Sequence, residues 1–357
     1  MYILSQKARS FTPYDPITGN YRVRLDANES FLLPTEADRA LMAEAAAAVA
    51  FNRYPDPLAS GVCGAFAALY GLSPELVTAG NGSDELIFVL MSAFLEKGDR
   101  VMPFSPDFAM YRFYADVAET PALVIPKKDD MSVDIDAVIA LLRREPVRML
   151  IFSNPCNPTS LGISAAEALR LVEAAADTLV VVDEAYMDFW DQSLLPRILD
   201  YDNLVILRTC SKALGMAALR LGFAVANPAI TAVLRAAKSP YNVNAVTQAM
   251  AEVALRNAVY HKVYPELLVQ SRRQLEDGLR HNAGILRVLE SRANFVFAQV
   301  PDAAGCWNAL AERGICVRRF GDRWLRITAG TEWENNQVVG ALALYFNQEG
   351  AYPCPTV

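Results

Sequence analysis

The residues best suited to chemistry fall into four polar clusters between residues 79 and 220. The first cluster, Ala79-Gly-Asn-Gly-Ser-Asp-Glu-Leu, stands directly before a helical pattern. Glycines followed by Ser83 and Asp84 at a helix start present free backbone N–H groups and the positive end of the helix dipole. This segment could therefore cradle a phosphate. Taken alone, it is explained more simply as an ordinary capped turn.

The second and third clusters supply an amide, a carboxylate and a phenol. Asn157 lies in a loop after the apolar run RMLIF, and its two flanking prolines stiffen that loop. Asp183 ends the run TLVVVD, and Tyr186 follows three residues later. Ligands of open α/β sheets bind at the carboxyl ends of the strands, so these side chains are expected to face one crevice. For Asp183 alone, a helix cap is an equally good explanation.

The fourth cluster, Arg208-Thr-Cys-Ser-Lys-Ala-Leu-Gly, contains a lysine in unusual surroundings. Lys212 is followed by apolar and small residues. A lysine in a partly desolvated pocket loses its proton more easily and can attack a carbonyl carbon. Eight residues later, Arg220 stands among apolar neighbours and is expected to be buried. A buried arginine requires an anion, which could be a phosphate or a protein carboxylate.

Only the combination of the four clusters indicates one chemistry. A reactive lysine, a carboxylate that keeps a pyridine nitrogen protonated, donors to a ring oxygen and a phosphate cradle are the requirements of pyridoxal phosphate. The chain has only two histidines, His261 and His281, and both stand in a helical pattern. This scarcity argues against a histidine-rich metal site or a Ser-His-Asp triad, and no metal is expected.

Short apolar runs alternate with helical patterns from about residue 60 to 250, and these elements must position the clusters. The runs are apolar throughout, as expected of strands that are buried on both faces of a mostly parallel sheet. The pattern predicts a doubly wound α/β fold. The predicted strands are Arg100–Pro103, Leu123–Ile125, Arg148–Phe152, Leu179–Asp183, Leu204–Arg208 and Gly222–Ala226.

The remaining segments predict a smaller α+β domain. The first 34 residues look irregular, and a helical pattern covers 35–50. Another helical stretch runs from Ala245 to Gly284, with a break expected near Pro265. Apolar runs and one helical pattern then alternate to the end of the chain. We expect an N-terminal arm (1–34) that joins the small domain, a large cofactor-binding domain (35–255) and a small C-terminal domain (256–357).

Composition excludes several classes of function. The net charge of −7 over 357 residues leaves no basic footprint for nucleic acid. No apolar run approaches the roughly 20 residues of a membrane helix, and the N-terminus lacks the features of a signal peptide. A cytoplasmic location is therefore expected, with no membrane partner. The six cysteines form no C-x-x-C pair, so reduced and mostly buried thiols are expected.

From about Ala8 to the last helical pattern, the chain resembles fold-type I pyridoxal-phosphate aminotransferases, and among them the histidinol-phosphate aminotransferases. The resemblance implies that Lys212 forms a Schiff base with the cofactor, that Asp183 pairs with the ring nitrogen, and that Tyr186 and Asn157 donate to the ring oxygen. Tyr54, in RYPDP, would reach the cofactor phosphate of a neighbouring subunit, which implies a homodimer with shared sites. The other cofactor contacts that the resemblance implies are the stacking ring of Phe108 and the phosphate ligands Gly82, Ser83, Asp84, Thr209 and Arg220.

The same resemblance assigns substrate contacts. Arg326, in WLRITAG, would clamp the α-carboxylate of the substrate, and Asn28, in LDAN, would lie near it. Tyr14 and Arg318 would lie at a distal phosphate. The implied reaction moves the amino group of histidinol phosphate to a 2-oxo acid, 2-oxoglutarate, and yields imidazole-acetol phosphate and glutamate. The chain has Phe108 where the resembled family commonly has tyrosine.

Two alternatives remain open from the sequence. On the same scaffold, the chain could be a threonine-phosphate decarboxylase or an aromatic amino acid aminotransferase, although LDANE and PYNVN favour histidinol phosphate. In a different class, it could be a non-catalytic cofactor-binding regulator. Such regulators usually carry a DNA-binding module, for which this chain has neither spare length nor a basic patch.

Overall fold

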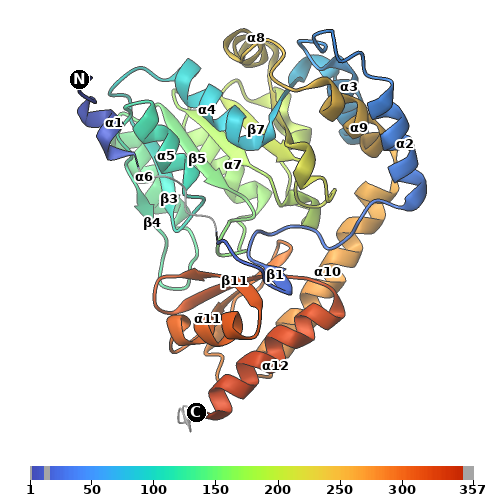
Figure 1. The fold of residues 1–357 in the computed structure, drawn as a ribbon. Coiled ribbons are helices and arrows are strands. Elements are labelled where there is room, and N and C mark those ends of the chain that lie inside the picture. The colour runs from blue at the N-terminus through green and yellow to red at the C-terminus, as the bar shows by residue number, and fades with distance from the viewer. Residues whose placement is uncertain (1, 12–16, 349–357) are drawn as a thin grey trace.

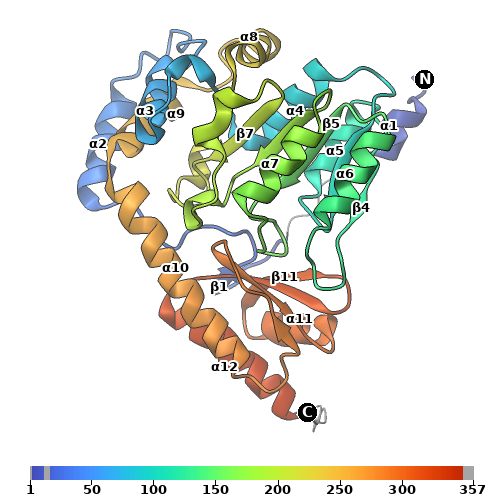
Figure 2. The same ribbon diagram turned by 180° about the vertical axis from the view of Figure 1, so that it is seen from behind.

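The computed structural model describes residues 2–11 and 17–348, whose larger sheet carries the predicted strands (Figures 1 and 2). The strand order is β2-β8-β7-β6-β5-β3-β4, and only β8 runs antiparallel to its neighbours. Each of the six predicted strands is present with its ends within two residues of the prediction, whereas β2 was missed. The bounds are β2 Val77–Asn81, β3 Val101–Ser105, β4 Ile125–Pro126, β5 Met149–Ser153, β6 Leu179–Asp183, β7 Leu204–Thr209 and β8 Leu221–Ala226.

Helices cover both faces of this sheet, which explains why its strands are apolar throughout. Alternate residues along one strand enter different cores, so Phe152 packs on one face and Ile151 on the other. The first core also holds side chains of α3 (Ser60–Tyr70), α6 (Ile135–Arg144), α7 (Ala165–Ala174) and α9 (Ala245–Arg256). The second holds side chains of α4 (Gly82–Phe94), α5 (Met110–Val117) and α8 (Pro228–Ala237). This architecture confirms the predicted α/β fold with a mostly parallel sheet.

A smaller sheet lies below the larger one in Figure 1 and combines one strand from the N-terminal part of the chain with four from the C-terminal part. Its order is β1-β11-β12-β10-β9, and β1 (Val23–Leu25) pairs in parallel with β11 (Ile315–Phe320). The first 34 residues are thus less irregular than expected, because they also include α1 (Gln6–Ser10). The domain boundaries themselves stay a prediction. The other strands are β9 Arg287–Val288, β10 Phe295–Gln299 and β12 Trp324–Thr328.

One face of the smaller sheet is covered by three helices. Val296 and Ile327 share a core with Leu275 and Leu342, which lie on α10 and α12. The opposite face carries Phe295, which packs with Tyr186 near the end of β6. The smaller sheet therefore presents one of its faces to the carboxyl ends of the larger sheet. The covering helices are α10 Val259–Arg280, α11 Ala303–Glu312 and α12 Glu332–Gln348.

The predicted helix break near Pro265 is wrong. The break falls at Asn257, between α9 and α10, and Pro265 lies inside α10. The Asn257 side chain accepts a hydrogen bond from the backbone N–H of Val259 and donates one to Asp38 of α2 (Glu36–Ala47). The Asn257 side chain thus binds the first backbone N–H of α10 and links the junction of the two helices to α2. Buried Tyr260 and Leu268 on either side keep α10 continuous through the proline.

The remaining elements are short. They are the 3-10 helices η1 Pro74–Leu76, η2 Met187–Phe189, η3 Leu195–Asp200 and η4 Ala217–Leu219. The cysteines within the described residues are buried and free, as expected. Within residues 2–11 and 17–348, no helix is both long and apolar enough to cross a membrane.

A buried ion-pair network joins the ends of β6 and β7. Arg208 contacts Glu184 at 3.0 Å and Asp188 at 2.8 Å, and the side chains of Arg208 and Glu184 are only 5% and 0% exposed. Tyr70 adds a hydroxyl donor to Asp188. Glu184 follows Asp183 in the chain and Arg208 precedes Thr209, so the network holds two strand ends that carry predicted site residues.

We predict that Glu184→Ala destabilises the apoprotein by about 3–5 kcal/mol, because it leaves the Arg208 guanidinium buried without one of its two carboxylates. Urea unfolding followed by circular dichroism measures the change. Asp136→Ala is the matched control, since it breaks an ion pair with Arg170 in which both side chains are at least half exposed. The control substitution should lower the free energy of unfolding far less. Equal losses for the two variants would contradict the role given to the network.

Candidate active site

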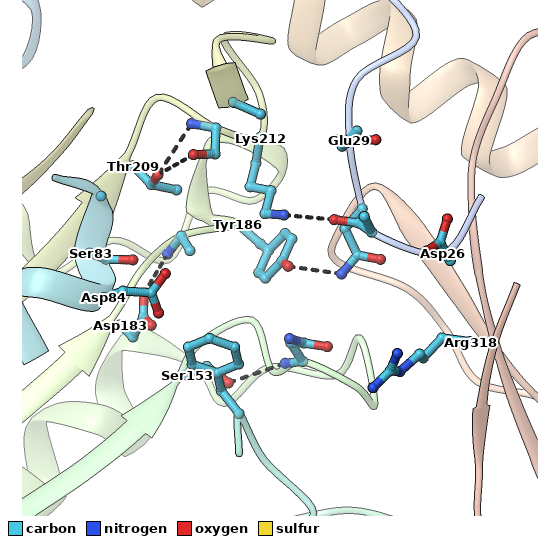
Figure 3. A pocket seen from close by; sticks show the side chains of 18 of the residues that line it. Asp26, Glu29, Ser83, Asp84, Ser153, Asp183, Tyr186, Thr209, Lys212 and Arg318 are labelled. Carbon is cyan, nitrogen blue, oxygen red and sulfur yellow. Dashed lines mark hydrogen bonds between the residues drawn. The ribbon is translucent and has the colours of Figure 1, made fainter. Parts of the chain in front are cut away.

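A cavity of about 420 Å³ lies between the carboxyl ends of the larger sheet and the inner face of the smaller one (Figure 3). Its walls come from segments that are far apart in the chain. The segment after β1 forms one side, the ends of β5, β6 and β7 form the floor, and β11 and β12 close the cavity. The sequence-predicted residues that line it are Asn28, Gly82, Ser83, Asp84, Phe108, Asn157, Asp183, Tyr186, Thr209, Lys212, Arg220, Arg318 and Arg326.

Lys212 places its amine at the centre of this cavity, just beyond β7. Its Nζ donates a hydrogen bond to the backbone oxygen of Ala27 at 2.9 Å and lies 5.8 Å from the centre of the Tyr186 ring. Burial lowers the pKa of Lys212 from 10.5 to about 8, and the positive charge of Arg326 acts in the same direction. The neutral, nucleophilic form of the amine is therefore far more accessible near neutral pH than it is for an ordinary lysine.

Asp183 is held rigidly at the end of β6. The carboxylate is buried, and its two oxygens accept from the Tyr111 hydroxyl at 2.8 Å and from the backbone N–H of Ala185 at 3.1 Å. Burial raises the pKa of Asp183 to about 7, while these two hydrogen bonds oppose the shift. Tyr111 was not predicted from the sequence. The only available signal was a phenol on the buried face of an amphipathic helix.

The first polar cluster forms a turn into α4, as the sequence predicted. Gly82 has a φ of +74°, a backbone conformation that side chains other than glycine rarely adopt. Gly222 of β8 passes so close that a Cβ atom there would lie 2.5 Å from the carbonyl carbon of Gly82 and the nitrogen of Ser83. The backbone N–H groups at the start of α4 thus stand at the edge of the cavity, where a helix N-terminus favours an anion.

The expected burial of Arg220 is wrong. Its side chain is 52% exposed and lies 3.6 Å from the carboxylate of Asp84. Arg220 follows η4 in the left-handed conformation, with φ of +50°, and this turn directs the side chain away from its apolar sequence neighbours and toward the cavity. Its guanidinium also lies 3.5 Å from the Ser211 hydroxyl, which contacts Thr209 at 3.0 Å. A protein carboxylate is thus its ion-pair partner here, beside the start of α4.

Arg326 reaches into the cavity from β12. Its guanidinium donates to the amide oxygen of Asn157 at 2.5 Å and to the backbone oxygen of Asp26 at 2.5 Å. The rings of Phe295 and Phe320 lie 5.5 and 5.6 Å from it. These contacts hold the planar fork of the arginine against the loop that carries Asn157.

Asn28 joins the two sheets. Its amide donates to the Tyr186 hydroxyl at 2.8 Å, and burial raises the pKa of Tyr186 to about 12. Asn28 has a φ of +55°, and its backbone is held by Thr328 and Asn294. Neither Thr328 nor Asn294 was assigned a role from the sequence, because their partner Asn28 is 266 or more positions away.

Some predicted residues lie elsewhere. Tyr54 does not line the cavity; it is 81% exposed and stacks on Tyr241, with ring centres 4.6 Å apart. Tyr14 lies outside the described residues. Conversely, Asp26 and Glu29 line the cavity although neither was predicted to be a site residue. They flank Asn28 in the LDANE motif, which was the signal that could have found them.

Known proteins are similar to this chain over nearly its whole length. Residues 22–342 match the family described as aminotransferase class I and II. The chain is similar to the histidinol-phosphate aminotransferase of Clostridium kluyveri, with 36% identity over 96% of this chain and 98% of the relative. The histidinol-phosphate aminotransferase of Thermococcus gammatolerans is also 36% identical, over 95% of this chain and 96% of the relative.

A solved structure with a similar fold is the histidinol-phosphate aminotransferase of Sinorhizobium meliloti in complex with pyridoxal-5'-phosphate. It has a TM-score of 0.87 and 24% identity, and the match covers 97% of this chain and 98% of that one. The predicted fold and enzyme class are confirmed. The family match and the near full-length relatives show that the chain belongs to the class I and II aminotransferases.

Proposed function

We propose that this aminotransferase moves the amino group of histidinol phosphate to 2-oxoglutarate, with pyridoxal phosphate as cofactor. The observation that carries the proposal is the meeting of Lys212, Asp183 and the turn before α4 in one cavity. The substrate is supported by the names of relatives that match over nearly the whole chain. As an aminotransferase, the chain acts on a small amino donor and a keto acid.

The residues of the cavity fit the cofactor. The backbone N–H groups at the start of α4, with Arg220 and Thr209 beside them, would hold the phosphate. Phe108 would stack on the ring, and Asn157 and Tyr186 would face its oxygen. The close approach of Gly222 supports this fit, because any larger residue would push the turn of Gly82 and Ser83 out of place. When bound, the cofactor supplies an aldehyde that exchanges amines and a ring that accepts electrons.

Two residues would act on protons. The neutral amine of Lys212 would take the proton from the α-carbon of the substrate, and its lowered pKa suits this role near neutral pH. Base catalysis of this kind typically contributes about 10²–10⁴-fold to the rate. Asp183 would hold a proton on the ring nitrogen of the cofactor, because the negative carboxylate and the positive ring nitrogen each stabilise the charged form of the other.

The substrate would be held by residues from both sheets. Arg326 would grip the α-carboxylate with its planar fork, with Asn28 close by. Arg318 lines the cavity on β11, directly opposite Arg326 in the register, and would meet the distal phosphate. Tyr14 is proposed for the same distal end.

Two nearby alternatives receive less support. A decarboxylase or an aromatic aminotransferase would use the same Lys212 and Asp183, but the relatives that match over nearly the whole chain are named for histidinol phosphate. A cytoplasmic location stays a prediction from the sequence.

The proposed donor is tested by supplying four amines in turn with 2-oxoglutarate and measuring glutamate. Histidinol phosphate should give a kcat/KM at least about tenfold above those of phenylalanine and tyrosine, because a hydrogen bond to a charged group contributes roughly 1.5–3 kcal/mol. Phosphothreonine should release no carbon dioxide. A higher kcat/KM for an aromatic amino acid, or carbon dioxide release, would support the corresponding alternative and remove the proposed donor.

For Arg326→Lys we predict weaker binding of both donor and acceptor, by about 1–3 kcal/mol, because lysine keeps the charge but loses the bidentate fork. Steady-state kinetics with each substrate varied measure the effect. Arg319→Lys is the control, since Arg319 is an exposed neighbour on β11 that does not line the cavity. If KM for both substrates stayed at the wild-type value, Arg326 would not be the carboxylate clamp.

A homodimer is proposed because large apolar side chains are exposed near Tyr54. Phe51 is 78% exposed and Tyr54 is 81% exposed, and Tyr241 stacks on Tyr54. Large apolar side chains exposed together often mark an interface. In a dimer, Tyr54 would reach the cofactor phosphate of the partner subunit. Sedimentation equilibrium should give twice the chain mass of 39.2 kDa. A monomer that keeps full activity would contradict the shared site.

A further inference from the structure

We propose that Tyr111 is a positioning residue that aligns two parts of the site at once: its hydroxyl orients the carboxylate of Asp183, and its ring and backbone fix the ring of Phe108. The inference rests on the proposed use of pyridoxal phosphate and adds a residue to it. Tyr111 itself does not line the cavity, so it would act only through these two neighbours.

The first contact fixes the orientation of the Asp183 carboxylate. The hydroxyl of Tyr111 donates to Oδ2 of Asp183, and the N–H of Ala185 donates to Oδ1. With both oxygens held, the carboxylate cannot rotate, and the lone pairs that remain can face the cavity. Tyr111 is fully buried in the core between α4, α5 and the sheet, so its own hydroxyl has a fixed position.

The second contact fixes the stacking ring. Phe108 and Tyr111 meet edge to face, with ring centres 5.6 Å apart and an interplanar angle of 84°. The backbone N–H of Tyr111 also donates to the carbonyl of Phe108 at 3.2 Å. The two residues are three positions apart near the start of α5. Tyr111 thus connects the Asp183 carboxylate in one part of the cavity to the Phe108 ring in another.

The charges around Asp183 explain why such a donor matters. Burial is the main cause that raises the pKa of Asp183, and the nearby carboxylates of Asp107 and Asp84 raise it further. Opposing them are the Tyr111 hydroxyl and the Ala185 N–H. Tyr186, another ionisable neighbour, stays neutral because burial raises its pKa to about 12. Without the Tyr111 hydroxyl, Asp183 would be protonated over a wider pH range and unable to hold a proton on the cofactor ring.

The test compares Tyr111→Phe, which removes only the hydroxyl, with wild-type protein. Apoprotein is titrated with pyridoxal phosphate at a series of pH values, and the dissociation constant is read from the change in absorbance. Affinity should fall as the pH drops through the pKa of Asp183, and in Tyr111→Phe this fall should occur at a higher pH. At neutral pH the variant should bind about tenfold or more weakly, as expected for loss of one hydrogen bond to a charged group.

Tyr201→Phe is the matched control, because it removes a hydroxyl that donates to a different carboxylate, Glu173, at 2.8 Å, away from the cavity. It should leave the pH midpoint of cofactor binding unchanged. A merely structural effect of Tyr111→Phe would lower affinity equally at all pH values, and that result would overturn the proposal. Thermal unfolding of each apoprotein checks that the variants are folded.

A second measurement is a double-mutant cycle that combines Tyr111→Phe with Asp183→Asn. In an Asp183→Asn background, Tyr111→Phe should have almost no further effect on cofactor affinity, because the hydroxyl that it removes acts through the Asp183 carboxylate, whereas the ring that contacts Phe108 is kept. Additive losses would overturn the proposal. This outcome is separable from that of the proposed function. Wild-type protein that binds no pyridoxal phosphate would end the proposed function. Normal binding by the wild type, with the same pH midpoint of binding in Tyr111→Phe, would end only the role of Tyr111.

Discussion

Removing an amine and a carboxylate from water is unfavourable unless neighbouring groups compensate, and the cavity of this chain is built around that constraint. Asp183 ends β6 and is buried, and Lys212 lies just beyond β7, where it is partly buried in the cavity. Their responses differ. The amine loses part of its affinity for a proton, while the carboxylate is kept ionisable by the donors of Tyr111 and Ala185. Both groups thereby come close to the protonation states that cofactor chemistry requires at neutral pH.

In the proposed function, the smaller sheet supplies the contacts to the substrate. Arg326 and Asn28 come from opposite ends of the chain, and β1 brings them together by pairing in parallel with β11. Through Asn157 and Tyr186, these residues contact the loops of the larger sheet directly. The fold alone would not indicate a function, because one scaffold can host many reactions. The proposed function rests instead on the side chains that this contact between the sheets brings together.

Most of the fold and most of the site could be predicted from the sequence, because strand ends and their polar residues are local patterns. Asp183 and Lys212 stand beside recognisable apolar runs, and the glycines before α4 mark a turn. The rest depends on contacts between distant segments. Tyr111 acquires its role only from Asp183, 72 positions later, and Thr328 only from Asn28, 300 positions earlier. Arg220 was expected to be buried because its neighbours in sequence are apolar, yet a left-handed turn directs it to the cavity, where its side chain is half exposed. Pro265 was expected to break a helix, yet the buried tyrosine and leucine around it keep the helix whole.

The central claim is that one primary amine, at position 212, bonds covalently to the cofactor. Treating the cofactor-loaded protein with borohydride makes that bond permanent, and mass spectrometry of the digested protein locates it. The account predicts that the added mass lies on Lys212 in nearly every molecule. Label found on another lysine, such as the partly buried Lys127, or no label despite bound cofactor, would contradict it.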